Sequence, residues 1–190
     1  MILFLIDNFV VESWPPIKIV HLRKEYTNWK KTVTKTAVHD TCVAFENSKV
    51  FALLGQNGAG KSTTLNILSG LSPATNGDAL IFGYSLKTQI HQIRQLMGVC
   101  PQHDILFNEL TAREHIELYS GLKGVPSSEW TAIVEERLGA VKLLNVVDNP
   151  VASYSGGMKR RLSVVIATIG DPKVVFLDGN LRYMLILTMN

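Results

Sequence analysis

The octapeptide Gly55-Gln-Asn-Gly-Ala-Gly60-Lys61-Ser62 narrows the possible folds of this chain, because it matches G-x-x-x-x-G-K-[ST] at every fixed position. The apolar run at 49–54 predicts a buried strand before it, and a helix is predicted after it from about Ser62 to Ser69. A strand that turns through glycines into a helix directs several backbone N–H groups, and the positive end of the helix, at one point. That arrangement suits a phosphate group, so we expect a nucleotide-binding protein.

The same region supplies side chains for the phosphates and their cation. Lys61 can bridge the β- and γ-phosphates, and the Ser62 hydroxyl can ligate Mg²⁺. A further ligand is expected at a strand end, and Val174-Val-Phe-Leu177 places an apolar run directly before Asp178. We therefore predict that Asp178 holds Mg²⁺ at the carboxyl end of a buried parallel strand.

Apolar patterning predicts strands and helices that alternate along the chain. Thr111 and Glu114 have the spacing of a capping box, which predicts a helix that ends at Gly121 or Gly124. The other predicted elements are short extended segments at 17–20, 37–38 and 43–45, strands at 78–82 and 96–100, and helices at 126–141 and 157–169. This alternation predicts an α/β fold with a mostly parallel sheet.

Composition excludes several classes of protein. The 190 residues are 46% hydrophobic and 18% charged, which indicates a globular domain. A net charge of +3 is too small to indicate a nucleic-acid partner. No apolar run reaches the ~18 residues that cross a bilayer. The two cysteines, Cys42 and Cys100, lie far apart in the sequence, so we expect two buried thiols in a reducing compartment.

Two other segments could belong to a nucleotide site. Gln102 follows the predicted strand at 96–100, where its amide could reach a cation or an attacking water, although a single glutamine is ordinarily a surface residue. Tyr154-Ser155-Gly156-Gly157-Met158 opens the predicted helix at 157–169 and could bind an anion, although Ser-Gly-Gly alone is also typical of a turn and helix cap. The residues by themselves leave both alternatives open.

The order and spacing of these segments resemble the nucleotide-binding domain of an ABC transporter. In this resemblance the Walker A motif contains Lys61, the Q-loop contains Gln102, and the Walker B motif ends at Asp178. The segment 154–158 resembles the LSGGQ signature. Tyr26 lies 29 residues before Gly55, where the family places an aromatic ring that stacks on adenine; a plain surface aromatic is the alternative.

The amino acids within these motifs are similar to those of subfamily A. The segments 53–64, 98–107 and 154–162 carry this similarity, and Met158 replaces the more general Gln of the signature, as that subfamily commonly allows. Members of the subfamily are large membrane proteins with two such domains, and most of those known move lipids. The resemblance implies an ATP-driven transporter half at the cytosolic face of a membrane, coupled to transmembrane domains that this chain lacks.

The resemblance also assigns roles residue by residue. It implies ATP and Mg²⁺ as cofactors, with catalysis by Lys61, Gln102 and Asp178 and metal binding by Ser62, Gln102 and Asp178. The residues that it assigns to ATP are Tyr26, Gly55, Asn57, Gly58, Gly60, Lys61, Ser62, Thr63, Ser155, Gly156 and Gly157. It further implies a second nucleotide-binding domain paired head to tail, so that the signature touches the ATP of the partner.

The resemblance divides the chain into a lead-in at 1–16, a partial ABC domain at 17–178 with a helical signature subdomain at about 103–160, and a non-matching tail at 179–190. It implies a P-loop NTPase core, an N-terminal antiparallel β subdomain and the helical subdomain, with the C-terminal part of the domain missing. Gly179 stands where the family has a catalytic Glu, so we expect Mg-ATP binding with poor hydrolysis. We also expect an open apolar face, to which Met184-Leu-Ile-Leu187 adds, and poor solubility.

Other functions are alternatives to this interpretation. A non-transport ABC ATPase would require linked twin domains or a coiled-coil insertion, and neither is evident in the sequence. A P-loop GTPase or kinase would leave the segment 154–158 unexplained, and a guanine-specific Asn-Lys-x-Asp is absent. A non-catalytic, truncated binding module, or the product of an incorrectly joined gene, would account for the tail.

Overall fold

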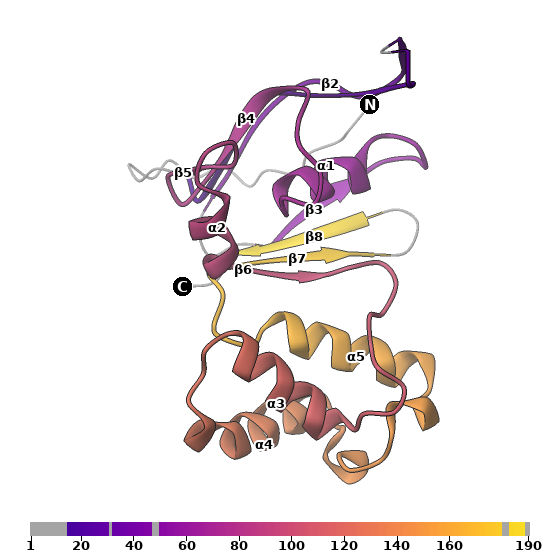
Figure 1. The fold of residues 1–190 in the computed structure, drawn as a ribbon, viewed down its shortest axis with the longest axis vertical. Coiled ribbons are helices and arrows are strands. Elements are labelled where there is room, and N and C mark those ends of the chain that lie inside the picture. The colour runs from indigo at the N-terminus through magenta and orange to yellow at the C-terminus, as the bar shows by residue number, and fades with distance from the viewer. Residues whose placement is uncertain (1–14, 31, 47–49, 180–182, 189–190) are drawn as a thin grey trace. The chain divides into compact units, whose positions relative to one another are not determined.

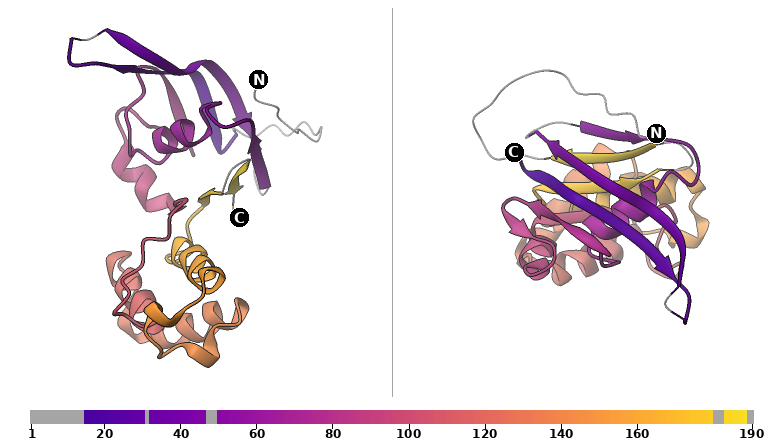
Figure 2. Two further views of the ribbon diagram at one scale, coloured as in Figure 1. Left: turned by 90° about the vertical axis from the view of Figure 1, so that its right-hand side faces the viewer. Right: turned by 90° about the horizontal axis from the view of Figure 1, so that it is seen from above.

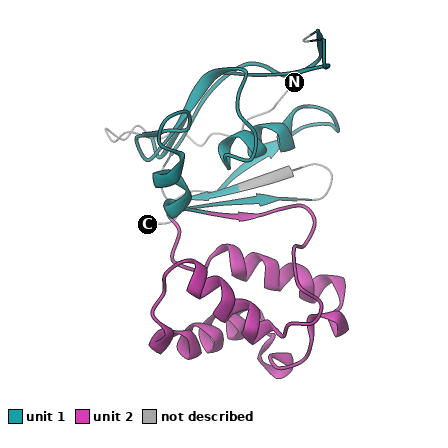
Figure 3. Ribbon diagram, viewed as in Figure 1, with its two compact units in different colours: residues 1–97, 173–190 teal, residues 98–172 magenta. Residues whose placement is uncertain are grey.

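The computed structural model describes residues 15–30, 32–46, 50–179 and 183–188. The chain forms two compact units, one made of residues 1–97 and 173–190 and the other of residues 98–172 (Figure 3). It leaves the first unit once and returns to it. The phosphate-loop segment and the strand that ends at Asp178 therefore belong to the same unit, although they are far apart in sequence.

The first unit contains most of the strands (Figure 1). They are β1 (Ile17–Thr27), β2 (Val33–Phe45), β3 (Val50–Leu54), β4 (Asn76–Ile81), β5 (Tyr84–Ser85), β7 (Val174–Asp178) and β8 (Tyr183–Thr188). Its helices are α1 (Lys61–Leu68) and α2 (Ile90–Leu96), and β6 (Met97–Cys100) leads from the first unit into the second.

One sheet of the first unit has the strand order β2–β1–β4–β5, and all its strand pairs are antiparallel. This confirms the antiparallel β subdomain expected near the N-terminus. However, β1 and β2 form one long ribbon (indigo in Figure 2), whereas the sequence predicted short segments separated by turns. The prediction was wrong because bulges shift the register on both sides of Leu22, which breaks the simple alternation of apolar and polar residues.

The other sheet has the order β3–β8–β7 within the first unit. β8 is antiparallel to both of its neighbours, so β3 and β7 run in the same direction. The α/β class is confirmed, while the parallel order expected here is interrupted by β8. The reason is the connection: only residues 179–182 separate β7 from β8, and a parallel strand requires a crossover of about a dozen residues or more.

Part of the tail contributes to the core of the first unit. Ile186 of β8 is 1% exposed. Thr188 is also buried, and its hydroxyl donates to the carbonyl of Glu46 at 3.3 Å. The expectation that the apolar run at 184–187 adds to an open surface was wrong at Ile186, because β8 pairs with a strand on each side.

Helix α1 packs its apolar residues onto the first unit. Leu65, Ile67 and Leu68 are buried, and the helix contacts β2, β7 and β8. Burying a side chain of this size contributes about 1.5–3 kcal/mol. The helix that follows the phosphate loop is therefore held from both sheets of its unit.

The second unit is built of helices. They are α3 (Ala112–Leu122), α4 (Trp130–Ala140) and α5 (Gly156–Ala167), with single 3-10 turns at Ser127–Glu129, Leu144–Val146 and Val151–Ser153. Their buried side chains form one core, which consists of Ala112, Ile116, Val134, Leu138, Leu143, Val151, Tyr154, Leu162, Val165 and Ile169. The three predicted helices are present, with ends shifted by a few residues.

Helix α3 begins with the predicted capping box. The Thr111 hydroxyl accepts the N–H of Glu114 at 3.2 Å, and the Glu114 carboxylate accepts the N–H of Thr111 at 2.7 Å. The hydrogen bond from this backbone N–H lowers the pKa of Glu114. The local sequence thus determines where α3 starts.

The two cysteines differ in burial. Cys100 is buried, but Cys42 is exposed on β2, so the expectation of two buried thiols was wrong for Cys42. The apolar context of Cys42 in the sequence did not reveal which face of the strand it occupies. Within the described ranges, none of the helices combines the length and the apolar character needed to cross a membrane.

Candidate functional site

The phosphate-loop segment links β3 to α1 in the conformation that its glycines permit. Gly58 has φ of 86° and Gly60 has φ of 92°, a region that residues with a Cβ rarely adopt. The N–H of Ala59 donates to the carbonyl of Gln56 at 3.1 Å, which closes the turn. Gly60 is the N-cap of α1 and provides no side-chain cap, and the first turn of α1 contains no acidic residue. The positive end of α1 is therefore suited to an external anion.

Gly60 is also required by packing. A Cβ at this position would lie 2.4 Å from the carbonyl oxygen of Ala37, which belongs to β2. At Gly58, in contrast, a Cβ would meet no atom within 4 Å. The loop is thus fixed against β2 at Gly60 and open at Gly58. The sequence motif requires a glycine at position 60, but it contains no signal for the contact with Ala37.

The Lys61 side chain folds back over its own loop. Its Nζ donates to the carbonyls of Gly55 at 2.7 Å and Gln56 at 3.0 Å. These two bonds hold a positive charge at the loop that the glycines form. Ser62 follows it with an exposed side chain, while Thr63 is half-buried. The segment therefore presents an ammonium group and a hydroxyl group beside the helix N-terminus.

Strand pairing places Asp178 at the same sheet edge as this loop. Met184 on β8 pairs with Leu53 of β3 on one side and with Asp178 of β7 on the other. These residues form one row across the sheet, so Asp178 lies level with Leu53, close to the start of the loop at Gly55. Neighbouring strands are about 4.8 Å apart, which separates β3 from β7 by about 10 Å. The half-buried Asp178 and the loop thus share one edge, with β8 as the spacer between their strands.

The β1–β2 register places Tyr26 on the same ribbon as the residue that Gly60 contacts. Tyr26 pairs with Lys35, two positions before Ala37, the residue against which Gly60 packs. Tyr26 is 42% exposed, and the Lys24 ammonium lies 5.4 Å from its ring centroid. An exposed aromatic face at this point is suited to stacking on a planar ring.

Gln102 lies in the second unit, on an exposed bend directly after β6. Arg160 of α5 holds the segment around it. The guanidinium donates to the carbonyl of Pro101 and pairs with Asp104 at 3.5 Å. The sequence does not predict this positioning role of Arg160, because a basic residue within a basic run gives no signal of a contact so distant in sequence.

The signature segment begins α5. Ser155 is the N-cap, and its hydroxyl accepts the backbone N–H three residues later at 3.3 Å. Ser155, Gly156 and Gly157 are exposed, and a Cβ on either glycine would meet nothing within 4 Å. Tyr154 before them is buried, and its hydroxyl donates to the carbonyl of Val146 at 2.7 Å. Burial raises the pKa of Tyr154, which favours the protonated phenol that donates this bond. The buried Tyr154 thus anchors the segment, while Ser155, Gly156 and Gly157 remain open to solvent.

A family model described as ABC transporter matches residues 38–181, a range that contains the loop, Gln102, the signature and Asp178. The chain belongs to the ABC transporter family. This match excludes the P-loop GTPase or kinase considered from the sequence. It also agrees with the first-unit geometry, in which the loop and Asp178 share one sheet edge.

Relatives of this ABC chain belong to the A family. ABC transporter A family member 1 of Dictyostelium discoideum is 47% identical over 86% of this chain and 19% of that protein. ABC transporter A family member 2 of Arabidopsis thaliana is 48% identical over 78% of this chain and 15% of that protein. The chain is thus an ATP-binding domain of the A family, and it spans less than a fifth of the length of either relative.

The fold also has a counterpart among solved structures. A dimeric ATP-binding cassette in a post-hydrolysis state superposes with a TM-score of 0.73, covering 85% of this chain and 73% of that chain. The two sequences are 23% identical, so the likeness concerns the fold alone.

Proposed function

We propose that this chain is the nucleotide-binding part of an A-family transporter, which binds Mg-ATP and couples it to the movement of lipids. The observation that carries the proposal is the placement of the glycine loop, Lys61 and Asp178 at one edge of one sheet. Within the chain we assign residues 17–178 to the ABC domain, residues 1–16 to a lead-in and residues 179–190 to a tail.

The first unit fits the triphosphate of ATP. The open space at Gly58 and the uncapped start of α1 leave room for an anion, and Lys61 provides a charge now directed at two loop carbonyls. We assign phosphate binding to this loop, namely Gly55, Asn57, Gly58, Gly60, Lys61, Ser62 and Thr63. We assign adenine stacking to Tyr26, because its ring is exposed and its strand leads to the residue that contacts Gly60.

The same edge fits Mg²⁺. Hydroxyl and carboxylate oxygens are the ligands that this cation prefers, and Ser62 and Asp178 provide one of each. Bound there, Mg²⁺ would neutralise phosphate charge. On the basis of its motif alone, we also assign the amide of Gln102 to metal binding. Lys61, Gln102 and Asp178 are then the residues that we assign to the reaction.

The signature fits a second nucleotide. Its Ser155, Gly156 and Gly157 are exposed at a helix N-terminus that carries no acidic residue in its first turn. We propose that they contact the ATP of a second ABC domain paired head to tail with this one. The fold neighbour, itself a dimer bound to ADP and phosphate, supports this pairing.

We propose weak hydrolysis because Gly179 follows Asp178 and offers no base. A missing general base costs a factor of roughly 10²–10⁴ in rate. Replacing Gly179 with Glu is expected to recover part of this factor in phosphate-release assays, and Gly179→Gln, which adds a similar volume without a base, is not. Hydrolysis by the unaltered chain at the rate of an intact ABC domain would contradict the proposal.

Binding is tested with a fluorescent ATP analogue and Mg²⁺. We expect saturable binding that a GTP analogue matches poorly and that Lys61→Ala abolishes. Lys87, an exposed lysine of the same unit, provides the matched control, because Lys87→Ala removes the same charge elsewhere. Equal loss in both variants would contradict the assigned role of Lys61.

Lipid transport at the cytosolic face of a membrane is the activity to test in any longer protein that contains this domain. ATP hydrolysis stimulated by phospholipid and lost in Lys61→Ala would support it. The A-family relatives favour this function over a non-transport ABC ATPase.

A non-catalytic binding module is the second candidate, and Gly179 favours it. Mg-ATP binding with no measurable turnover, even in a head-to-tail pair, would indicate that second function.

A further inference from the structure

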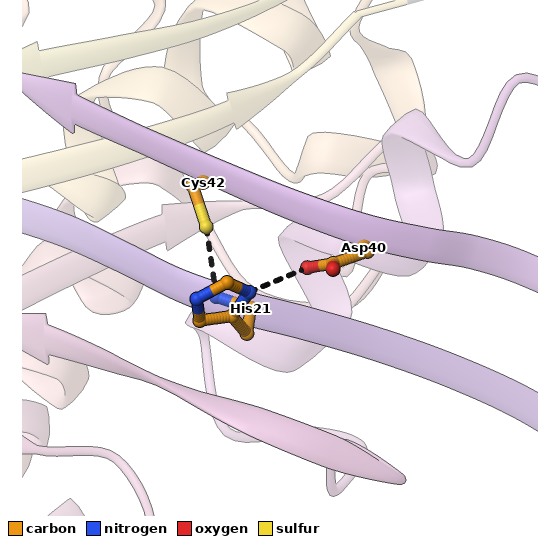
Figure 4. A group of neighbouring side chains, drawn as sticks. All are labelled: His21, Asp40 and Cys42. Carbon is orange, nitrogen blue, oxygen red and sulfur yellow. Dashed lines mark hydrogen bonds and ion pairs between the residues drawn. The ribbon is translucent and has the colours of Figure 1, made fainter.

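We propose that His21, Asp40 and Cys42 form a binding site for Zn²⁺ on the β1–β2 ribbon. The three side chains gather on neighbouring strands of the ribbon (Figure 4). One potential ligand atom from each, an imidazole nitrogen, a carboxylate oxygen and the thiol sulfur, lies within 4.8 Å of the other two. All three residues are exposed and belong to the first unit.

Two opposed bulges create this cluster. Between the pairs Ile19↔Val43 and Leu22↔Thr41, β1 has one residue more than β2, so that Cys42 faces both residue 20 and residue 21. Between the pairs Leu22↔Thr41 and Lys24↔Val38, β2 has the additional residue, which frees Asp40 from regular pairing. Bulges redirect side chains, and this pair turns His21 and Asp40 to the same side of the ribbon as Cys42.

The bulge at His21 is strained and supported from the neighbouring strand. His21 has φ of 47°, which is uncommon for a residue with a Cβ. On β4, Gly77 makes room for it, because a Cβ there would lie 1.9 Å from the His21 carbonyl oxygen. A glycine thus permits the conformation that brings the imidazole to Asp40, with 3.0 Å between Nδ1 and the carboxylate oxygen.

The donor set suits Zn²⁺. Thiolate, imidazole and carboxylate are its usual ligands in proteins, at about 2.3 Å for sulfur and about 2.0–2.2 Å for nitrogen and oxygen. Small rotations of exposed side chains would bring the three atoms to those distances. Three protein ligands leave a fourth position of the tetrahedron open to water. Mg²⁺ and Ca²⁺ prefer oxygen ligands, so the cysteine and the histidine select against them.

The arrangement favours metal binding over nucleophilic catalysis. The Cys42 sulfur accepts the backbone N–H of His21 at 3.2 Å, whereas the His21 ring pairs with Asp40 (Figure 4). A catalytic thiol requires such a base to take its proton. Bound metal would instead link β1 to β2 beside the strand segment that contacts Gly60.

The test is a metal titration of the full chain, reduced, chelator-treated and free of nucleotide. We expect one Zn²⁺ per chain by calorimetry. With Co²⁺ as a probe, we expect a thiolate-to-metal charge-transfer band and visible bands typical of tetrahedral coordination. Cys42→Ser should remove the charge-transfer band. Cys42→Ser and His21→Ala should each weaken Zn²⁺ binding about tenfold or more, since even residues that only hydrogen-bond to a metal ligand contribute about 10–100-fold.

Two controls separate this site from nonspecific binding. His91, an exposed histidine of α2, is the matched control, and His91→Ala should bind Zn²⁺ like the unaltered chain. Should a variant fail to fold, alkylation of the unaltered chain gives a second readout. Zn²⁺ should slow iodoacetamide modification of the exposed Cys42, and Mg²⁺ should not. Zn²⁺ binding unaffected by Cys42→Ser, or alkylation unaffected by Zn²⁺, would overturn the proposal.

Discussion

Replacing Gly60 with alanine is expected to weaken both the stability of the first unit and its nucleotide binding. The new Cβ would lie 2.4 Å from the carbonyl oxygen of Ala37. That oxygen cannot move away easily, because the adjacent residues Thr36 and Val38 pair with β1. The loop must therefore shift, and the N-terminus of α1 must shift with it.

The size of the effect follows from two terms. A left-handed conformation costs a residue with a Cβ roughly 1–2 kcal/mol. Overpacking against atoms that must move adds about 1–3 kcal/mol. Gly58→Ala is the matched control, because Gly58 has φ of 86° but open space for a Cβ. Gly58→Ala therefore costs only the left-handed conformation, without overpacking. The difference between the two variants isolates the contact with Ala37.

Urea unfolding followed by circular dichroism measures the two losses of stability, and binding of a fluorescent ATP analogue measures the functional cost. We expect Gly60→Ala to lower the free energy of unfolding by about 1–3 kcal/mol more than Gly58→Ala does. Equal losses in the two variants would refute the reasoning, because the packing of the loop against β2 would then contribute nothing.

Three further outcomes are expected from the structure. Tyr154→Phe should lower the stability of the second unit by about 1 kcal/mol in urea unfolding, because the carbonyl of Val146 loses its donor; an unchanged midpoint would contradict this. Ile186→Ala should cost about 2–5 kcal/mol, against much less for the half-buried Leu187→Ala, if β8 is part of the core. The pKa of Glu114 is lowered, so the ionised carboxylate stabilises the folded state above the ordinary glutamate pKa, and this stabilisation is lost as pH falls through the lowered pKa. Glu114→Gln should therefore remove this part of the decrease in melting temperature with falling pH, as measured by thermal melts.

Local patterns in the sequence predicted the parts of the site that depend on neighbouring residues. The conformation of Gly58 and Gly60, the start of α1 and the capping box at Thr111 all depend on contacts within a few residues. The N-cap at Ser155 belongs to the same class. For these features, residue type and spacing are sufficient, because backbone freedom and capping hydrogen bonds act over a single turn.

Features that join distant segments were not predictable in the same way. Nothing around Arg160 indicates that it holds the segment before Gln102, since that contact depends on how α5 packs in its unit. The apolar run of the tail looked like an unpaired surface, although Ile186 is buried between two strands. A run of apolar residues signals burial but does not identify the partner.

The amino-acid sequence by itself determined that this chain carries a phosphate loop, a signature helix and an aspartate at a strand end, because each is a short motif with its own local geometry. Only the tertiary structure decided that β8 sets the spacing between the loop and Asp178. Only the tertiary structure, again, joined His21 to Asp40 and Cys42 through two opposed bulges. The physical reason is that strand register depends on pairing between residues far apart in the chain, and a shift of one residue turns a side chain to the other face.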